Sequence, residues 1–148
     1  TLSLHDALPI LLYPGRVPNQ SQIVSEVDQT NANFQAILGK DFKTRIFRYP
    51  GGHMSWQGLE ATDHALANQG IQWIDWNMLC GDAEPLSVRP TTSETMMAYM
   101  DGSQQYFPES HVKVVLMHDT AGKELTVQTL PQIIEYFKNQ GYTFGVLE

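Results

Sequence analysis

The sequence of 148 residues contains a single cysteine, Cys80. One cysteine excludes a disulfide within the chain and a cluster of thiolate ligands for a metal. Basic residues are also scarce, because 9 Lys and Arg stand against 16 Asp and Glu, and the formal net charge is −7. This balance argues against nucleic-acid binding, which needs a basic surface. No apolar run approaches the ~20 residues that span a bilayer, so we predict no membrane span.

The patterns that most often bind a metal are absent as well. No His-x-x-x-His occurs, and His53 and His64 are too far apart to form a ligand pair one helical turn apart. We therefore predict no metal site in this chain. Asp63 and His64 are expected on the solvated face of a helix, and His111 in a loop beside a strand.

The first ten residues, TLSLHDALPI, resemble translated read-through of a sequencing adapter. We set residues 1–10 aside as a non-native leader; a genuine apolar strand is the alternative. Because the chain begins with Thr1 and not with methionine, the lack of a recognisable signal peptide carries little weight.

Hydrophobic periodicity and turn residues predict four alternations of helix and strand. The length suits one domain, and 42% apolar with 17% charged residues is typical of a globular protein. Alternation with these connection lengths predicts an α/β fold with parallel strands and outer helices. The predicted helices cover residues 21–38, 58–69, 91–99 and 130–139, and the predicted strands cover residues 45–48, 71–76, 112–117 and 142–147.

Two helix starts have specific signals. Thr92 or Ser93 can cap the third helix. Pro131 places the start of the last helix near Leu130, because proline is tolerated only in the first turn of a helix.

Apolar and aromatic side chains mark the core and one possible binding surface. The nearly continuous apolar run at residues 112–117 is typical of a strand buried on both faces. Tyr49, Trp73 and Trp76 could offer a surface on which a sugar stacks. Trp73 or Trp76 is nevertheless expected in the core.

In folds of this kind, functional residues gather at the C-terminal ends of the strands. His118 directly follows a predicted strand, where a histidine can act as a general acid or a metal ligand; a structural histidine bonded to a carbonyl is the alternative. Arg48 ends another strand just before Gly51 and Gly52. There an arginine can hold a carboxylate, and glycine N–H groups can approach a ligand. A surface arginine beside a turn is the alternative reading.

Carboxylates follow the strand at residues 71–76. Either Asp75 or Asp82 could hydrogen-bond His118 and fix its tautomer. A turn or capping role is the alternative for each aspartate.

These motifs resemble the polysaccharide deacetylase family, the NodB-homology domain of carbohydrate esterase family 4. Arg48-Tyr-Pro-Gly-Gly matches the third motif of the family, residues 75–82 resemble the fourth, and Val114-Val-Leu-Met-His118 matches the fifth. Residues 130–144 are similar to the terminal helix and strand of the family. The resemblance covers residues 11–148 and implies the C-terminal part of a distorted β/α barrel.

The resemblance implies a hydrolase that removes acetyl groups from the N-acetylated sugars of peptidoglycan, chitin or related glycans. It implies zinc or another divalent metal as the cofactor of the parent enzyme and an extracellular or cell-envelope location. His118 would be the general acid, Asp82 its partner, and Arg48 the residue that holds the aspartate base. The implied substrate-binding residues are Leu116 in the acetyl pocket, Gly51 through its N–H toward the oxyanion, Tyr49 and Asp75.

The sequence departs from the family pattern in two ways. Asn77 and Ala83 stand where many members have aspartate and tryptophan, so the choice between Asp82 and Asp75 stays open. The first two family motifs, Thr-Phe-Asp-Asp and His-x-x-x-His, supply the base and the metal ligands, and neither occurs here. Residues 11–16 resemble the segment that follows the second histidine. We therefore expect a truncated fragment that binds no metal and is inactive alone; a non-catalytic glycan-binding or structural domain and an unrelated β/α hydrolase are the alternatives.

Overall fold

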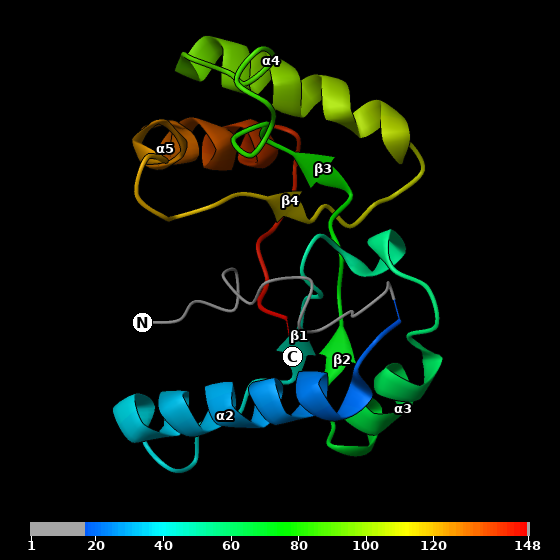
Figure 1. The fold of residues 1–148 in the computed structure, drawn as a ribbon. Helices are drawn as coiled ribbons and strands as arrows, with labels where there is room; N and C mark the ends of the chain where they lie inside the picture. The colour runs from blue at the N-terminus through cyan, green and yellow to red at the C-terminus, as the bar shows by residue number, and fades with distance from the viewer. Residues whose placement is uncertain (1–16, 148) are drawn as a thin grey trace. The chain divides into compact units, whose positions relative to one another are not determined.

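The computed structural model describes residues 17–147, which form two compact units. Among these residues, unit 1 comprises 17–75 and 146–147, and unit 2 comprises 76–145. Each unit has one pair of short parallel strands with helices beside it (Figure 1). The predicted α/β class with parallel strands is confirmed. The predictions about the leader at 1–10 and the segment at 11–16 lie outside the described residues.

Unit 1 is built around a strand–helix–strand connection. Strands β1 and β2 are parallel, with Ile46 opposite Gln72, and the helix α3 lies between them in the chain. Gly70, with φ +78°, follows the end of α3 and lets the chain turn into β2, as predicted. The described elements are α2 (Gln20–Leu38), β1 (Ile46–Phe47), the 3-10 helix η3 (His53–Ser55), α3 (Glu60–Asn68) and β2 (Gln72–Trp73).

Helix α2 buries only its N-terminal half. Ile23 and Val27 are 2% and 3% exposed and lie in the core of unit 1. Phe34, Ile37 and Leu38 were predicted to continue this apolar face, but all three are exposed. The apolar pattern of the sequence therefore continues beyond the part of α2 that packs on the core of unit 1.

Unit 2 repeats the strand–helix–strand arrangement. Strands β3 and β4 are parallel, with Met78 opposite Val115, and α4 lies between them in the chain and packs on α5. Cys80 is fully buried in this core, and burial raises the pKa of its thiol to about 11. The elements are β3 (Met78–Leu79), α4 (Ser93–Ser103), the 3-10 helix η4 (Gln104–Tyr106), β4 (Val115–Leu116) and α5 (Glu124–Asn139).

The helix ends of unit 2 confirm one prediction and correct another. Thr92 is the N-cap of α4, and its side chain exchanges hydrogen bonds with Thr95 in a capping box. Helix α5 begins at Glu124, six residues before the predicted start, and contains Pro131. Pro131 is tolerated because it lies on the exposed face of α5, where the unbonded carbonyl of Val127 can be hydrated.

The predicted strand at 112–117 is shorter and less buried than expected. Only Val115 and Leu116 pair with β3, and Val112 is 70% exposed. The side chain of Asn77 explains the late start of the strand, because it accepts from the N–H of Val114 and donates to the carbonyl of Val112. Asn77 thus occupies the backbone groups that a longer strand would have used.

Two other strand predictions were wrong. Residues 71–76 form only β2 at 72–73, and a separate strand, β3, follows in unit 2. Residues 142–147 form no strand within the described chain, and Tyr142 instead donates its N–H to the carbonyl of Phe137 at the end of α5. Within residues 17–147, no helix combines the length and apolar character that would span a membrane.

Candidate functional site

The side chains of Asp82 and His118 meet in unit 2. Asp82 follows β3 and His118 follows β4, so both stand past the C-terminal ends of paired parallel strands. His118 Nδ1 lies 2.8 Å from Asp82 Oδ1, and the His118 backbone N–H donates to Asp82 Oδ2 at 2.7 Å. The Asp82 side chain is 4% exposed and that of His118 is 16% exposed. Of the two aspartates left open by the sequence, Asp82 therefore makes this contact.

Helix α5 supplies two further contacts to Asp82. Thr126 Oγ1 donates to Asp82 Oδ2 at 3.0 Å, and Lys123 Nζ donates to the backbone carbonyl of Asp82. Burial alone raises the pKa of Asp82, but hydrogen bonds from the ring and backbone of His118 and from Thr126 outweigh it, so the pKa lies below 3.8. Asp82 is therefore ionised at neutral pH.

The ionised carboxylate determines how the imidazole of His118 is held. A carboxylate only accepts hydrogen bonds, so His118 Nδ1 carries a hydrogen directed at Asp82. This contact fixes the ring and directs its second nitrogen, Nε2, away from Asp82. A histidine held in this way can exchange a proton at Nε2 with a bound molecule.

We expect Asp82→Asn to make the free energy of unfolding depend less on pH in the acid range. The pKa of Asp82 is lower in the folded protein than the ~3.9 of an unfolded aspartate, so the unfolded chain binds more protons at acid pH. The stabilisation from Asp82 is therefore present above about pH 4 and is lost as the pH falls through the folded pKa.

Urea unfolding from about pH 3 to about pH 6 measures this effect. The free energy of unfolding should fall less steeply toward acid pH in Asp82→Asn than in the wild type. Asp119→Asn, which alters an exposed aspartate beside His118, is the matched control and should retain the wild-type slope. Parallel profiles for Asp82→Asn and the wild type would contradict the prediction.

Four of the other predicted site residues belong to unit 1 and lie on or beside the loop 48–56 that follows β1: Arg48, Tyr49, Gly51 and Asp75. Arg48 is the first residue after this strand. Gly51 has φ +73°, a left-handed conformation that favours glycine, and a Cβ at this position would meet only the side chain of Ser55 at 3.7 Å. Gly52 is also left-handed, with φ +87°, and its N–H donates to the carbonyl of Tyr49 at 2.9 Å.

Tyr49 does not offer the sugar-stacking surface that was predicted for it. Its side chain is 1% exposed, and its ring contacts Phe47 edge-on in the core of unit 1, with centroids 4.8 Å apart. The hydroxyl donates to Asp63 Oδ1 at 2.7 Å. The short strand β1 turns this side chain inward, because alternate residues of a strand point to opposite faces.

Asp75 braces the same loop from the end of β2. Its two carboxylate oxygens lie 3.0 and 2.9 Å from the backbone N of His53. The contact explains why an aspartate follows β2, and it gives Asp75 a structural partner within unit 1.

Three residues of unit 1 form a cluster that the sequence did not reveal. His53 Nε2 lies 2.8 Å from Asp63 Oδ2, and the His53 ring stacks on Trp73 with centroids 3.9 Å apart and an interplanar angle of 14°. Asp63 was predicted to be solvated and Trp73 was a candidate for the core, but Asp63 has two partners and Trp73 is 39% exposed. Trp76, the other core candidate, is half-buried. The prediction of an exposed His64 is confirmed.

Comparison with models of known protein families gives no match. Among solved structures, a Streptococcus mutans CE4 esterase is 55% identical, with a TM-score of 0.93 over 97% of this chain and 60% of its own. Along most of its length the chain is similar to polysaccharide deacetylases. The catalytic domain of a peptidoglycan N-acetylglucosamine deacetylase from Eubacterium rectale is 27% identical, with a TM-score of 0.66 over 88% of this chain and 58% of its own.

Two curated relatives are named as deacetylases. A bifunctional xylanase/deacetylase from Pseudobutyrivibrio xylanivorans is 31% identical over 85% of this chain, and YheN of Bacillus subtilis, named as a polysaccharide deacetylase, is 30% identical over 84%. The chain spans only 18% and 41% of the length of these two proteins. It therefore corresponds to part of each relative.

Enzymes of the polysaccharide deacetylase family generally depend on a divalent metal, so the described donor groups were tested against such an ion. Within residues 17–147, no three His, Cys, Asp or Glu side chains lie close enough together to hold one. His118 Nδ1 and Asp82 are committed to each other, and Cys80 is buried and protonated. The described part of this chain does not fit the metal.

Leu116 is the remaining residue that the resemblance placed in the deacetylase site. It lies in β4, is half-buried, and precedes His118 by two residues. Because side chains of a strand alternate, Leu116 and His118 are predicted to face the same side of the strand.

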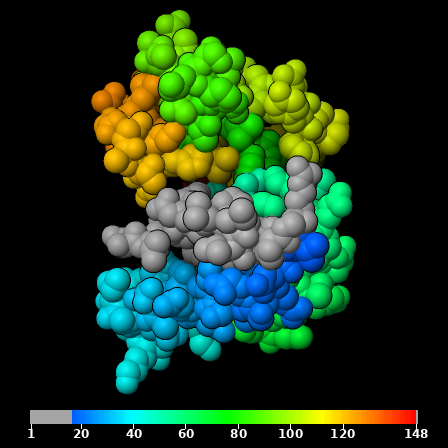
Figure 2. All heavy atoms as spheres, viewed as in Figure 1, coloured from blue at the N-terminus to red at the C-terminus, as the bar shows by residue number. Residues whose placement is uncertain are grey.

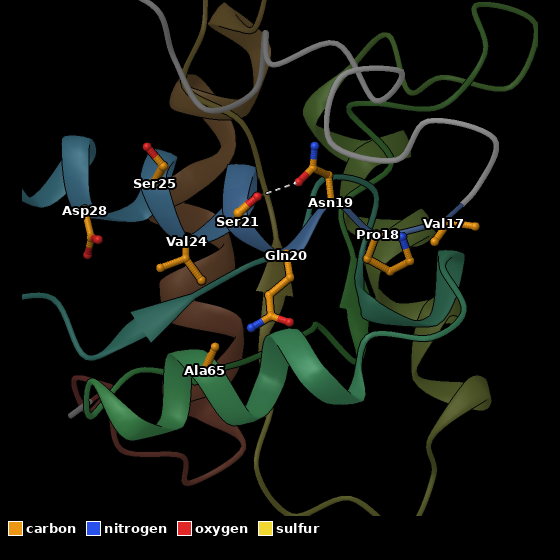
Figure 3. Close-up of a pocket in the computed structure, with 9 residues that line it drawn as sticks. All are labelled: Val17, Pro18, Asn19, Gln20, Ser21, Val24, Ser25, Asp28 and Ala65. Atoms are coloured by element: carbon orange, nitrogen blue, oxygen red, sulfur yellow. Dashed lines mark hydrogen bonds between the residues drawn. The ribbon is translucent and has the colours of Figure 1, made fainter.

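A separate depression of about 1030 Å³ lies in unit 1 along the N-terminal part of α2 (Figure 3). Ala65 of α3 faces it across from Gln20, and α2 reaches the molecular surface here (Figure 2). Asp28 is the one ionisable side chain among the residues that line it. This composition offers no pair of groups for acid–base chemistry, so the His118 region remains the candidate site.

Proposed function

We propose that this chain is the C-terminal part of the catalytic domain of a polysaccharide deacetylase that removes N-acetyl groups from peptidoglycan, chitin or a related glycan. In the parent enzyme the chain would complete a distorted β/α barrel. The observation that carries the proposal is the buried, ionised Asp82, which holds His118 past the end of β4. Similarity to polysaccharide deacetylases supports the reaction class. An extracellular or cell-envelope location is part of the same proposal.

The proposed role of His118 is to protonate the leaving nitrogen. Hydrolysis of an N-acetyl group joins a water oxygen to the carbonyl carbon and breaks the bond from carbon to nitrogen, and the leaving nitrogen takes up a proton. Asp82 fixes the imidazole through Nδ1, so that Nε2 can deliver this proton.

The other predicted residues have proposed roles at the acetyl group. The backbone N–H of Gly51 would stabilise the oxyanion, and Leu116 would line the pocket for the methyl group. Arg48 would hold the aspartate that acts as base. That aspartate and the ligands of a divalent metal would come from the Thr-Phe-Asp-Asp and His-x-x-x-His motifs of the parent protein.

The test is to recover the uninterrupted gene and to assay its protein for acetate release from N-acetylglucosamine oligomers and from peptidoglycan. We expect both missing motifs in the parent sequence and acetate release by the parent protein. The 148-residue chain alone should release no acetate and bind no stoichiometric zinc.

Two results would contradict the proposal. An intact parent gene without the two motifs, whose product binds these glycans but releases no acetate, would favour the non-catalytic glycan-binding alternative. Turnover by the 148-residue chain alone would show that the missing motifs are not needed.

A further inference from the structure

Side-chain hydrogen bonds hold the loop 49–56 of unit 1 at several points. Within the loop, Ser55 Oγ donates to the carbonyl of Gly51 at 2.6 Å, and Trp56 Nε1 donates to the carbonyl of Pro50 at 2.7 Å. From outside, Asp75 accepts the N–H of His53 with both carboxylate oxygens. The backbone around Gly51 and Gly52 is therefore fixed in its left-handed conformation by side chains as well as by glycine itself.

The ring of His53 extends this bracing to helix α3. His53 Nε2 lies 2.8 Å from Asp63 Oδ2, and Tyr49 donates to the other oxygen, Oδ1, at 2.7 Å. Asp63 thus joins both ends of the turn at 49–53 to the first turn of α3. The ring of Trp73 covers the His53 ring at a centroid distance of 3.9 Å and ties it to β2.

All these groups stand at one edge of the β1–β2 pair. Tyr49 and His53 follow β1, Asp75 follows β2, and Asp63 lies in the first turn of the helix that β1 leads into (Figure 1). In open α/β sheets, this carboxyl edge is where ligands bind. The side chains of His53 and Asp63 are only about one-quarter exposed, so these polar groups have lost most of their contact with water. Apolar side chains would pack here without this cost in solvation free energy, which indicates a role beyond the packing of unit 1.

We propose that His53 and Asp63 are positioning residues that set the backbone N–H of Gly51 for the acetyl oxyanion. This inference rests on the proposed deacetylase function and extends it to residues that the reaction does not touch. An oxyanion donor must be in place before the charge develops, and an error of about 1 Å in such a group can cost about 10²-fold in rate. The carboxylate of Asp63 holds the loop without contacting the substrate.

Replacement of His53 in the parent enzyme separates its two contacts. His53→Phe keeps an aromatic ring that can stack on Trp73 but removes the hydrogen bond to Asp63, and His53→Gln keeps a donor for Asp63 but removes the stack. We expect kcat to fall about tenfold in His53→Phe and in Asp63→Asn, with KM within about twofold of the wild type. His53→Gln should recover most of the lost kcat.

Two neighbours on α3 serve as matched controls. His64→Gln and Glu60→Gln alter exposed side chains beside Asp63 and should retain the wild-type kcat. Amide hydrogen exchange provides a readout that does not depend on activity. Exchange in a peptide covering residues 49–57 should accelerate in His53→Phe and Asp63→Asn, and exchange in a peptide covering α4 should not change.

The outcomes distinguish this inference from the proposed function. Wild-type kcat in His53→Phe and Asp63→Asn, together with loss of activity in His118 variants, would overturn the inference and leave the function intact. A lower melting temperature with unchanged kcat per folded molecule would also overturn it, because the network would then serve stability alone. If the parent enzyme releases no acetate, the proposed function is wrong. If amide exchange in residues 49–57 is unchanged in His53→Phe and Asp63→Asn, these side chains do not hold the loop.

Discussion

His118→Gln in the parent enzyme should lower kcat by about 10²–10⁴-fold, the usual contribution of a general acid. Glutamine can still donate a hydrogen bond, but it cannot transfer a proton to the leaving nitrogen. KM should change little, because the proton is needed in the transition state and not in the bound substrate. Acetate release at saturating substrate measures kcat directly.

Asp82→Asn should lower kcat as well, by about 10²-fold. The amide of asparagine can donate as well as accept, so His118 Nδ1 is no longer held as a donor, and the tautomer with its hydrogen on Nε2 becomes accessible. The ring is then no longer fixed at Nδ1 by a carboxylate, so Nε2 is less well placed to deliver its proton to the leaving nitrogen. The substitution also removes the negative charge that lies 2.8 Å from Nδ1.

His64→Gln is the control for His118→Gln, because His64 is an exposed histidine on α3 of unit 1. Its kcat should match the wild type within about twofold. Circular dichroism of each variant shows whether the fold is retained, which matters because His118 and Asp82 share two hydrogen bonds. If folded His118→Gln keeps a kcat within about threefold of the wild type, the general-acid role is wrong.

The sequence predicts the candidate residues whose positions follow from strand order. His118 comes directly after an apolar strand in unit 2, and Arg48 comes directly after a strand in unit 1, so the rule about carboxyl ends of parallel strands is enough to make each a candidate. The pairing of β1 with β2 and of β3 with β4 agrees with the alternation of helix and strand. The candidate positions themselves depend only on residues close together in the chain, because each is identified from the strand that directly precedes it.

The partner of His118 could not be chosen from the sequence, because Asp75 and Asp82 both follow the strand predicted at 71–76. The structure separates them by placing the additional strand β3 between the two aspartates. Thr126 comes from α5, 44 residues after Asp82, and no local pattern reveals such a contact. Long-range hydrogen bonds of this kind are determined by tertiary packing and leave no periodic signal.

The cluster of His53, Asp63 and Trp73 was missed for a related reason. Asp63 lies in a helix of ordinary amphipathic composition, where an acidic residue in the first turn usually faces solvent. Trp73 lies in a strand that is only two residues long, so its apolar character does not decide which face it takes. The 3-10 turn of η3 brings His53 back toward both, and turn geometry is poorly specified by residue type alone.

Gly81→Ala should lower the free energy of unfolding by about 2–5 kcal/mol, because a backbone cost and a steric cost add. Gly81 has φ +81°, a conformation that costs a residue with a Cβ about 1–2 kcal/mol. The site is also filled, because a Cβ would lie 2.8 Å from Cδ1 of Tyr99 and 3.0 Å from Cδ of Pro90. Overpacking of this kind adds about 1–3 kcal/mol, because the new methyl group would meet inner ring atoms of Tyr99 and the proline ring and not the end of a flexible side chain.

Gly122→Ala isolates the backbone contribution. Gly122 has the same φ of +81°, but a Cβ there would meet no atom within 4 Å. Gly122→Ala should therefore lose only about 1–2 kcal/mol, and the difference between the two variants in urea unfolding measures the steric part. Equal losses in the two variants would show that Tyr99 and Pro90 yield to the new methyl group without cost.

The position of Gly81 makes the same substitution a test of the site. Gly81 directly precedes Asp82, so a backbone shift that relieves the contact with Tyr99 also moves the carboxylate that holds His118. We expect Gly81→Ala to lower kcat of the folded parent enzyme by about tenfold, since a small displacement of a positioned group is costly in rate. Gly122→Ala should keep the wild-type kcat. Loss of stability in Gly81→Ala with full kcat would mean that Asp82 is held by its hydrogen bonds to His118 and Thr126 strongly enough to resist the shift.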